Sequence, residues 1–184
     1  MSRVKLLFKS ASEIVDVGGE GLLLLTDERQ TRQIAVVCNL ERLKDIAREM
    51  DGGSESRMNL LKALWSMLSD RAPAMEIEVD AIEGQEYHAV LRDADSVDYY
   101  PISMTDAVLL VIVSHGSLPL YMDKQLFMSQ SSSYNGGLGG VQLPVNIISD
   151  QMLLSALDKA VKEENYELAS RLRDEIKRRK DRKK

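Results

Sequence analysis

The chain has 184 residues, 44% of them hydrophobic and 29% charged, which is ordinary for a soluble globular protein. Its single cysteine excludes an internal disulfide, and no apolar run reaches the roughly eighteen residues that span a bilayer. The start lacks the apolar core of a signal peptide, so we expect a cytoplasmic protein with no membrane contact. The formal net charge is −5, yet residues 177–184 carry +6, so residues 1–176 carry −11. An acidic body repels the phosphates of nucleic acid. The basic end either attracts DNA or RNA or keeps the chain soluble and compensates the helix dipole.

The first half of the chain predicts three strands and two helices. Apolar, β-compatible runs cover residues 4–8, 21–26 and 34–38. Apolar side chains then recur at helical spacing from Leu40 to Met50, and Asp51-Gly52-Gly53 ends that helix. A second helix, capped by Ser54 or Ser56 and followed by Pro73, is predicted to bury Leu60, Leu61, Leu64, Trp65 and Leu68.

The next segment predicts a hairpin of strands followed by a covered helix. Apolar and acidic residues alternate over 75–81, and Glu83-Gly84-Gln85 forms a turn into a partner strand at 87–91. After an extended run at 97–102, Ser103 and Asp106 have capping-box spacing before the apolar run 107–113. That run favours a helix, with a buried strand as the alternative because it is rich in β-branched residues. Gly116 ends it, and 118–122 predicts a short final strand.

The last third of the chain predicts a linker and a pair of helices. Residues 129–140 are rich in serine and glycine, without the strand and the Lys-Ser/Thr pair of a phosphate loop. Apolar residues then recur at helical spacing over 153–161 and 166–176, on either side of a polar turn. The expected fold class is α+β: a mixed or antiparallel sheet with packed helices, plus a C-terminal α-helical hairpin. The expected domains are a body at 1–128, a linker at 129–148 and the hairpin at 149–184.

The runs ENYELA at 164–169 and RLRDEI at 171–176 resemble the UVR motif. This motif is shared by the UvrB and UvrC excision-repair proteins and by adaptors of Clp-type chaperones. The resemblance covers nearly all of the last 34 residues and implies a helical hairpin that binds a protein partner. Two such short helices bury little surface alone, so the hairpin is expected to pack against its own body, a second copy or another protein. The alternative is a solvated tail. The expected contact residues are Leu157, Tyr166, Ala169, Leu172 and Ile176.

Three stretches of the body resemble the bifunctional nuclease family, whose domain is reported to cut both DNA and RNA. They are 33–39 with the helix ending at 50–52, then 57–61, and finally 105–107 with 116–121. The resemblance covers about 4–127, and a UVR motif accompanies this domain in some bacterial members. It implies hydrolysis of phosphodiester bonds in DNA or RNA, with Mg²⁺ or Mn²⁺ as the implied metal. Asp106 is then the candidate catalytic residue, as metal ligand or general base.

The departures from this family's pattern fall on polar positions. The family's Thr-His-Asp is Arg57-Met58-Asn59 here, and the arginine before Asp106 is missing. The family's glutamate near the start of the first helix falls on or beside Glu41 and Arg42, and an ungapped register gives Arg42. The alternative function is therefore a non-catalytic regulator or adaptor that binds a partner through the hairpin. Exposed strand edges also predict a homo-oligomer.

Each remaining candidate residue has a structural alternative. Asp106 is equally suited to stabilise a helix N-terminus, and His115 to sit as a cation at a helix C-terminus. His88 falls on the polar face of the alternating strands, and Cys38 is expected in the core. Three acids share one strand face, where they either collect a divalent cation or form the wet side of the sheet: Glu76, Glu78 and Asp80.

Overall fold

A computed structural model describes residues 2–14, 19–51, 60–69, 74–83, 86–93, 97–134, 136 and 148–182. Its strands are β1 (Arg3–Glu13), β2 (Glu20–Asp27), β3 (Arg32–Asn39), β4 (Met75–Glu83), β5 (Glu86–Asp93), β6 (Tyr99–Ile102), β7 (Leu120–Asp123) and β8 (Ser132–Ser133). Its helices are α1 (Leu40–Met50), α2 (Leu60–Leu68), α3 (Met104–Val113), α4 (Lys124–Gln130), α5 (Asp150–Lys162) and α6 (Tyr166–Arg182).

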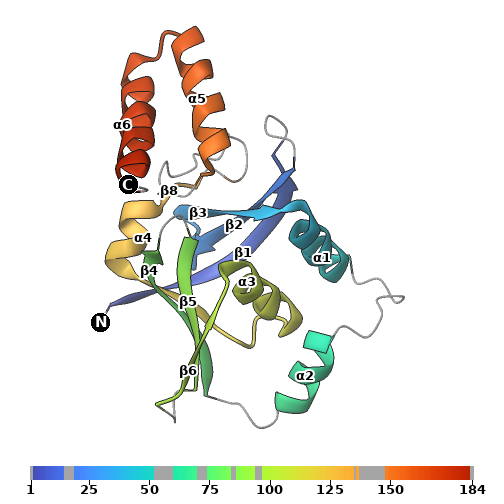
Figure 1. Cartoon of the computed structure of the whole chain (residues 1–184). Coiled ribbons are helices and arrows are strands. Elements are labelled where there is room, and N and C mark those ends of the chain that lie inside the picture. The colour runs from blue at the N-terminus through green and yellow to red at the C-terminus, as the bar shows by residue number, and fades with distance from the viewer. Residues whose placement is uncertain are drawn as a thin grey trace.

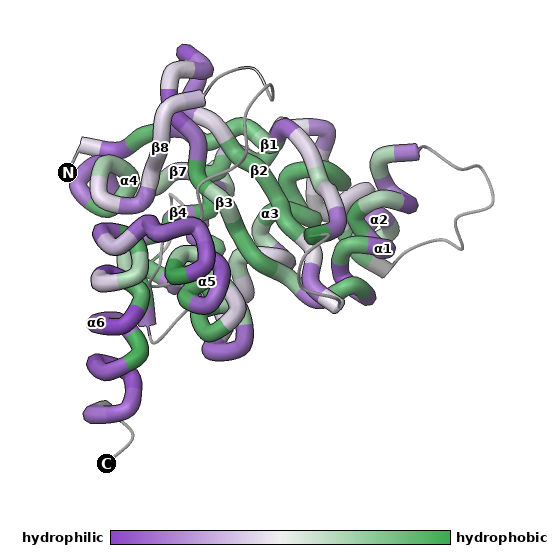
Figure 2. The backbone as a smooth tube through the Cα atoms, turned by 90° about the horizontal axis from the view of Figure 1, so that it is seen from above, coloured by the Kyte–Doolittle hydropathy of each residue, from purple (hydrophilic) through white to green (hydrophobic). Residues whose placement is uncertain are grey.

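The described strands form one mixed sheet in the order β6-β5-β4-β7-β1-β2-β3-β8. Adjacent strands in this sheet pair antiparallel, except for β4 and β7, which pair parallel. Helices α1, α2 and α3 lie on one face of the sheet, and the α5–α6 hairpin lies on the other (Figures 1 and 2). Phe127 of α4 is buried in the same core as side chains of α1 and α3. The predicted α+β class and the C-terminal helical hairpin are confirmed.

Side-chain caps explain where α1 and α3 begin. The Asn39 side chain accepts a hydrogen bond from the Arg42 N–H, and the Ser103 hydroxyl accepts one from the Asp106 N–H. At the other end of α3, His115 and Gly116 have φ angles of 52° and 76°, a left-handed turn that stops the helix. The apolar run after Ser103 is therefore a helix rather than a buried strand.

The structure differs from the expected order of elements after Gly116. The strand predicted as the last one, β7, lies in the middle of the sheet, where Leu120 pairs with Leu6 on one side and Ile77 on the other. Helix α4 follows it unpredicted, capped by the Asp123 side chain. Part of the predicted linker is folded too: β8 pairs with β3, and Arg32 donates hydrogen bonds to Ser131. Residues 137–147 of that linker lie outside the described part of the chain.

Helix α2 buries less of its predicted face than its spacing indicates. Leu61 and Trp65 pack against the core, but Leu64 is 44% exposed. The side chains of Leu60 and Leu68 lie outside the described residues, as do the predicted cap at Ser54 or Ser56 and Pro73.

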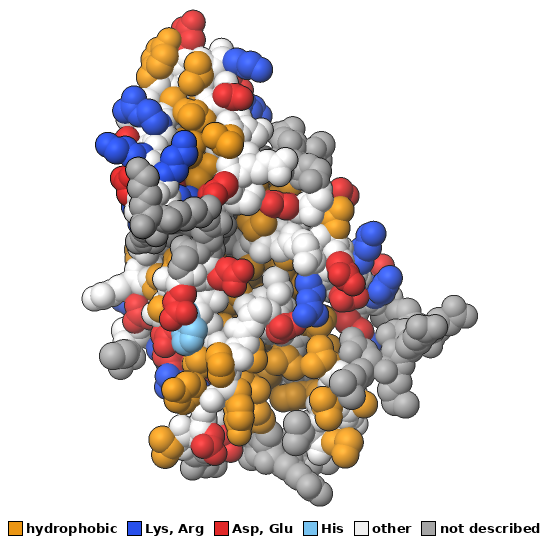
Figure 3. Space-filling model, in the orientation of Figure 1, with side chains coloured by type: hydrophobic (Ala, Val, Ile, Leu, Met, Phe, Trp, Pro, Cys, Tyr) orange, Lys and Arg blue, Asp and Glu red, His pale blue; other side chains and the backbone are white. Residues whose placement is uncertain are grey.

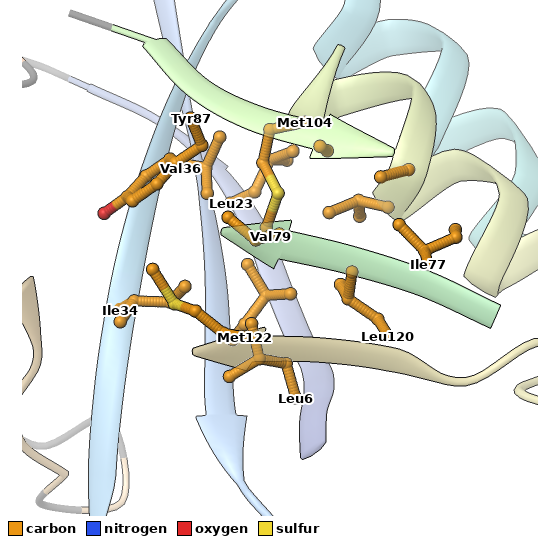
Figure 4. Packing of buried hydrophobic residues seen from close by; sticks show 14 of the residues in the cluster. Leu6, Leu23, Ile34, Val36, Ile77, Val79, Tyr87, Met104, Leu120 and Met122 are labelled. Atoms are coloured by element: carbon orange, nitrogen blue, oxygen red, sulfur yellow. The ribbon is translucent and has the colours of Figure 1, made fainter. Parts of the chain in front are cut away.

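The main core lies between the sheet and helices α1 and α3. Figure 4 shows side chains from β1, β2, β3, β4, β7 and α3 meeting there, including Leu6, Leu23, Val36, Ile77, Met104, Leu120 and Met122. Gly21 of β2 lets α1 approach the sheet, since a Cβ at that position would stand 2.9 Å from the Leu43 Cβ and 3.0 Å from the Cys38 sulfur. Cys38 is buried in this core, as predicted.

The hairpin has a small core of its own. Its buried members are Ile148, Met152, Leu153, Ala160, Ala169 and Leu172. Ile14 and Val37 of the body pack against this cluster. Along β3, Ile34, Val36 and Cys38 face the main core, so Val37 faces the hairpin on the opposite side of the sheet. None of the described helices is long and apolar enough to cross a membrane.

Candidate functional site

Two helix starts and three strands surround a pocket of about 570 Å³. The helix starts contribute Asn39, Arg42, Ser103, Met104, Thr105 and Asp106, and the strands contribute Glu20, Val36, Val37, Cys38, Glu86 and Tyr87. The pocket therefore contains Asp106, the catalytic candidate, together with Arg42.

Both carboxylate oxygens of Asp106 have partners. Oδ2 accepts a hydrogen bond from the Ser103 hydroxyl at 2.7 Å, and Oδ1 lies 3.2 Å from the Arg42 guanidinium. The Ser103 hydroxyl in turn accepts the Asp106 N–H at 3.0 Å, which is the N-cap half of the predicted capping box. Asp106 thus holds the start of α3 and ties it to α1, whether or not it also takes part in catalysis.

Two residues that line this pocket each carry a buried side-chain oxygen with no hydrogen-bond partner among the described residues. These oxygens are Oε2 of Glu20, at the start of β2, and the hydroxyl of Tyr87, in β5. Tyr87 is 5% exposed, and burial raises the pKa of its hydroxyl. Burial, aided by the nearby charge of Glu20, raises the pKa of the Cys38 thiol to about 11. Cys38 is therefore a protonated core thiol at neutral pH rather than a nucleophile.

The three acids of β4 do not gather around a cation site. Each has a basic partner: Glu76 pairs with Arg3, Glu78 with Arg92 at 3.1 Å, and Asp80 with the ring of His88 at 2.7 Å. Glu78 is buried, so this face of the strand is only partly exposed to solvent. Across the described part of the chain, no three His, Cys, Asp or Glu side chains come together as metal ligands.

The two histidines have local roles in the structure. The hydrogen bond to Asp80 raises the pKa of His88 above its ordinary value. His115 adopts the left-handed conformation that ends α3, and its N–H donates to the carbonyl of Ile112. Neither lines the pocket that contains Asp106.

The predicted contact residues of the hairpin divide into two groups. Ala169 and Leu172 are buried between α5 and α6, and Leu157 and Ile176 are half-buried against the same cluster. Tyr166, in contrast, is 69% exposed. The structure therefore gives Ala169 and Leu172 a packing role inside the hairpin.

Two apolar side chains of α5 are exposed, Val161 of the predicted apolar stripe and Leu154, which the sequence alone did not single out. Leu154 and Val161 of α5 are each more than half exposed and, with Leu157, repeat at a spacing of three and four residues along one helix face. Leu154 and Ile176 line a groove of about 160 Å³ between the two helices. Figure 3 shows hydrophobic side chains running along the front of the hairpin, beside basic side chains. The i, i+7 spacing of Leu154 and Val161 is the signal that identifies them.

A buried arginine closes the open end of the hairpin. Arg179 donates hydrogen bonds to the carbonyl of Ile148 at 2.7 Å, to Asp150 at 2.9 Å and to Glu175 at 2.9 Å. Burial alone would raise the pKa of Glu175, but hydrogen bonds from Arg178 and Arg179 outweigh it and lower that pKa. The end of α6 is thereby joined to the start of α5.

Replacing Arg179 with Met should loosen the hairpin selectively. The change leaves buried oxygen atoms without their charged donor, at a cost of about 1.5–3 kcal/mol. Hydrogen exchange followed by mass spectrometry should then report faster exchange in α5 and α6 and unchanged exchange in the sheet. Arg173→Met, at an exposed pair with Asp174, is the matched control. Equal exchange in both variants would contradict this role for Arg179.

Low pH should have the same effect on the wild-type chain. A carboxyl whose folded pKa is depressed contributes stability that is complete above the unfolded value and is lost as pH falls through the folded one. Protection of the hairpin should therefore decline below the ordinary glutamate pKa of about 4.3, and less so in Glu175→Gln.

An edge of the sheet also exposes large apolar side chains. Strand β6 lies at one end of the sheet, and Val97, Tyr99 and Tyr100 are exposed there. Since an open edge can pair with a second copy, we expect self-association through β6. Light scattering after size exclusion should find a dimer or larger species for the wild type and a monomer for Tyr99→Lys combined with Tyr100→Lys. A monomeric wild type would overturn this expectation.

Comparison with known families identifies the hairpin. Residues 153–181 match the family described as UvrB/uvrC motif, which confirms the predicted UVR motif over most of α5 and of α6. The resemblance of the body to the bifunctional nuclease family stays a prediction. A search of curated proteins finds no match to this chain.

Proposed function

We propose that this chain binds a protein partner through its UVR hairpin, and that its body is a non-catalytic relative of the bifunctional nucleases. The observation that carries the proposal is the set of exposed apolar side chains within the matched segment, Leu154, Val161 and Tyr166. Contiguous exposed apolar side chains rimmed by charge are typical of protein interaction sites.

The state of the pocket supports the non-catalytic part of this proposal. Metal-assisted phosphodiester hydrolysis uses carboxylates that are free to bind a cation. Asp106 instead faces the guanidinium of Arg42. The ion pair neutralises the carboxylate and links two helices, which is a structural task.

The test is binding of a partner to the full chain and to surface variants. A partner captured from an extract of the source cells would be purified and titrated calorimetrically. The combined change Leu154→Asp and Val161→Asp should weaken its affinity at least about tenfold, because it places charges on the contact face. Met67→Asp, at a side chain of α2 that is 72% exposed, is the matched control and should bind as the wild type does. Full affinity in the hairpin variant would refute the proposal.

Hydrolysis of DNA or RNA is the second candidate function. It is favoured by the position of Asp106 in a pocket large enough for part of a nucleotide. Cleavage of fluorescent single-stranded DNA and RNA would be measured with Mg²⁺, with Mn²⁺ and with EDTA. Metal-dependent cleavage lost in Asp106→Asn, with the melting temperature recorded alongside, would establish an enzyme. Equal signals from wild type and variant under every condition would support the non-catalytic proposal.

A further inference from the structure

The groove between α5 and α6 is apolar at its centre and basic along α6. Leu154 and Ile176 line it, and Lys180 lines it as well. Arg173, Lys177 and Lys180 follow one another along α6 at helical spacing, so they share the helix face that borders the groove. Figure 3 shows basic side chains along one border of the hydrophobic strip on the hairpin. The groove is therefore bordered by a row of cations.

Ion pairing separates this row from the other basic side chains of the helix. Among the described residues, Lys177 and Lys180 have no ion pair, and Arg173 reaches only the adjacent Asp174, at 3.7 Å. The remaining described arginines of α6 have acidic partners at 2.6–2.9 Å: Arg171, Arg178 and Arg179. The positive charge of α6 that is not compensated within the hairpin therefore lies on the face toward the groove.

The acid that lines the groove does not cancel this charge. Asp150 pairs with Arg179 at 2.9 Å, so its charge is compensated, while Lys180 has no such partner. Leu154 is 55% exposed, and the half-buried Ile176 faces it across the groove. A complementary molecule thus presents apolar groups to the centre of the groove and negative charges to α6.

Two classes of macromolecule carry negative charge, nucleic acid and acidic protein segments. The phosphate backbone of DNA or RNA has no aliphatic side chains to place against Leu154 and Ile176, and residues 1–176 carry a net charge of −11 that repels it. An amphipathic helix supplies both an apolar stripe and charged flanks, and such helices bind in apolar grooves. The groove therefore favours a protein segment.

We propose that this groove binds an amphipathic helix of a partner protein whose apolar stripe is flanked by acidic side chains. Its apolar residues pack on Leu154 and Ile176, and its carboxylates lie along Arg173, Lys177 and Lys180. The apolar contacts supply affinity, and the charges select the partner and fix its direction in the groove. This identity of the partner rests on the proposed binding function of the hairpin.

The experiment is a titration of the full chain with two labelled synthetic helices, followed by fluorescence anisotropy. Each helix has about three heptads with leucine at a and d, and carries either glutamate or lysine at e and g, so that like charges oppose self-pairing. We expect the glutamate helix to bind at least about tenfold more tightly than the lysine helix, and this difference to shrink in about 0.5 M salt.

Three results would overturn an acidic partner helix. They are equal or tighter binding of the lysine helix, no saturable binding of either helix up to about 1 mM, and tighter binding of a single-stranded thymidine oligonucleotide than of the glutamate helix. The last result would assign the cations to nucleic acid.

Charge reversal tests the assigned side chains. Lys180→Glu should weaken binding of the glutamate helix about tenfold and strengthen binding of the lysine helix, an opposite change that unfolding cannot produce. Arg171→Glu makes the same charge change about two and a half turns away, on the far side of α6, and should bind both helices as the wild type does. Unchanged preference in Lys180→Glu would refute the acidic partner. The proposed binding function fails separately, if Leu154→Asp with Val161→Asp keeps full affinity for the captured partner.

Discussion

Replacing Leu120 with Ala should lower the free energy of unfolding of the body by about 2–5 kcal/mol. Leu120 is 1% exposed and lies in β7, between β1 and β4, so its side chain packs where both halves of the sheet meet. The loss is a large share of the 5–15 kcal/mol that stabilises a typical domain. Because the cavity opens at the centre of the sheet, neighbouring strands cannot collapse into it without breaking their pairing with β7.

Urea unfolding followed by the fluorescence of Trp65 measures this loss. Trp65 is the single tryptophan of the chain, and it packs against the main core, so its emission reports the body and not the hairpin. The matched control is Leu64→Ala, the same change at a leucine of the body that is 44% exposed, which should alter stability by no more than about 0.5 kcal/mol. Similar midpoints for the two variants would contradict the central position of β7 in the core.

Replacing Leu172 with Ala should unfold the hairpin while the body stays folded. Leu172 is 2% exposed and belongs to the small cluster between α5 and α6, which is separate from the main core. The change should lower the free energy of unfolding of the hairpin by about 2–4 kcal/mol. This loss is larger than the stability of two short helices, since helices of this length are marginal without their packing. The hairpin touches the body through Ile14 and Val37, so its loss leaves the main core intact.

Circular dichroism and Trp65 fluorescence together separate the two units. Leu172→Ala should reduce the helical signal by the contribution of α5 and α6 and leave the Trp65 unfolding curve unchanged. It should also abolish partner binding. Leu168→Ala, at a more exposed leucine of the same helix, is the control and should keep the helical signal. If the change instead shifts the Trp65 unfolding curve as well as the helical signal, the hairpin and the body unfold as one unit.

These two experiments also decide how the functions relate. If the hairpin unfolds alone, the exposed face of α5 and α6 can be removed without disturbing the pocket at the starts of α1 and α3. Partner binding and hydrolysis can then be assayed on separate parts of one chain. If the two units unfold together, each variant must be compared at equal stability.

Local signals made most of the secondary structure predictable from the sequence. Alternation with a period of two identified β4, and helical spacing identified α1, α5 and α6. The pair Ser103 and Asp106 located the start of α3, because a capping box depends on residues only three positions apart. The same locality explains the UVR motif, whose residues lie within one pair of neighbouring helices.

The sequence by itself therefore determined the α+β class, the helical hairpin and its UVR motif, and the capping role of Asp106. Tertiary structure alone decided that β7 is central, that β8 extends the sheet into the serine-rich segment, and that Arg42 meets Asp106. It also decided which apolar residues of the hairpin are exposed, and brought Glu20 to the same pocket as Tyr87. The physical reason is separation along the chain: periodicity and caps act over a few residues, whereas strand order, ion pairs and pockets join residues far apart, and only packing selects among those partners.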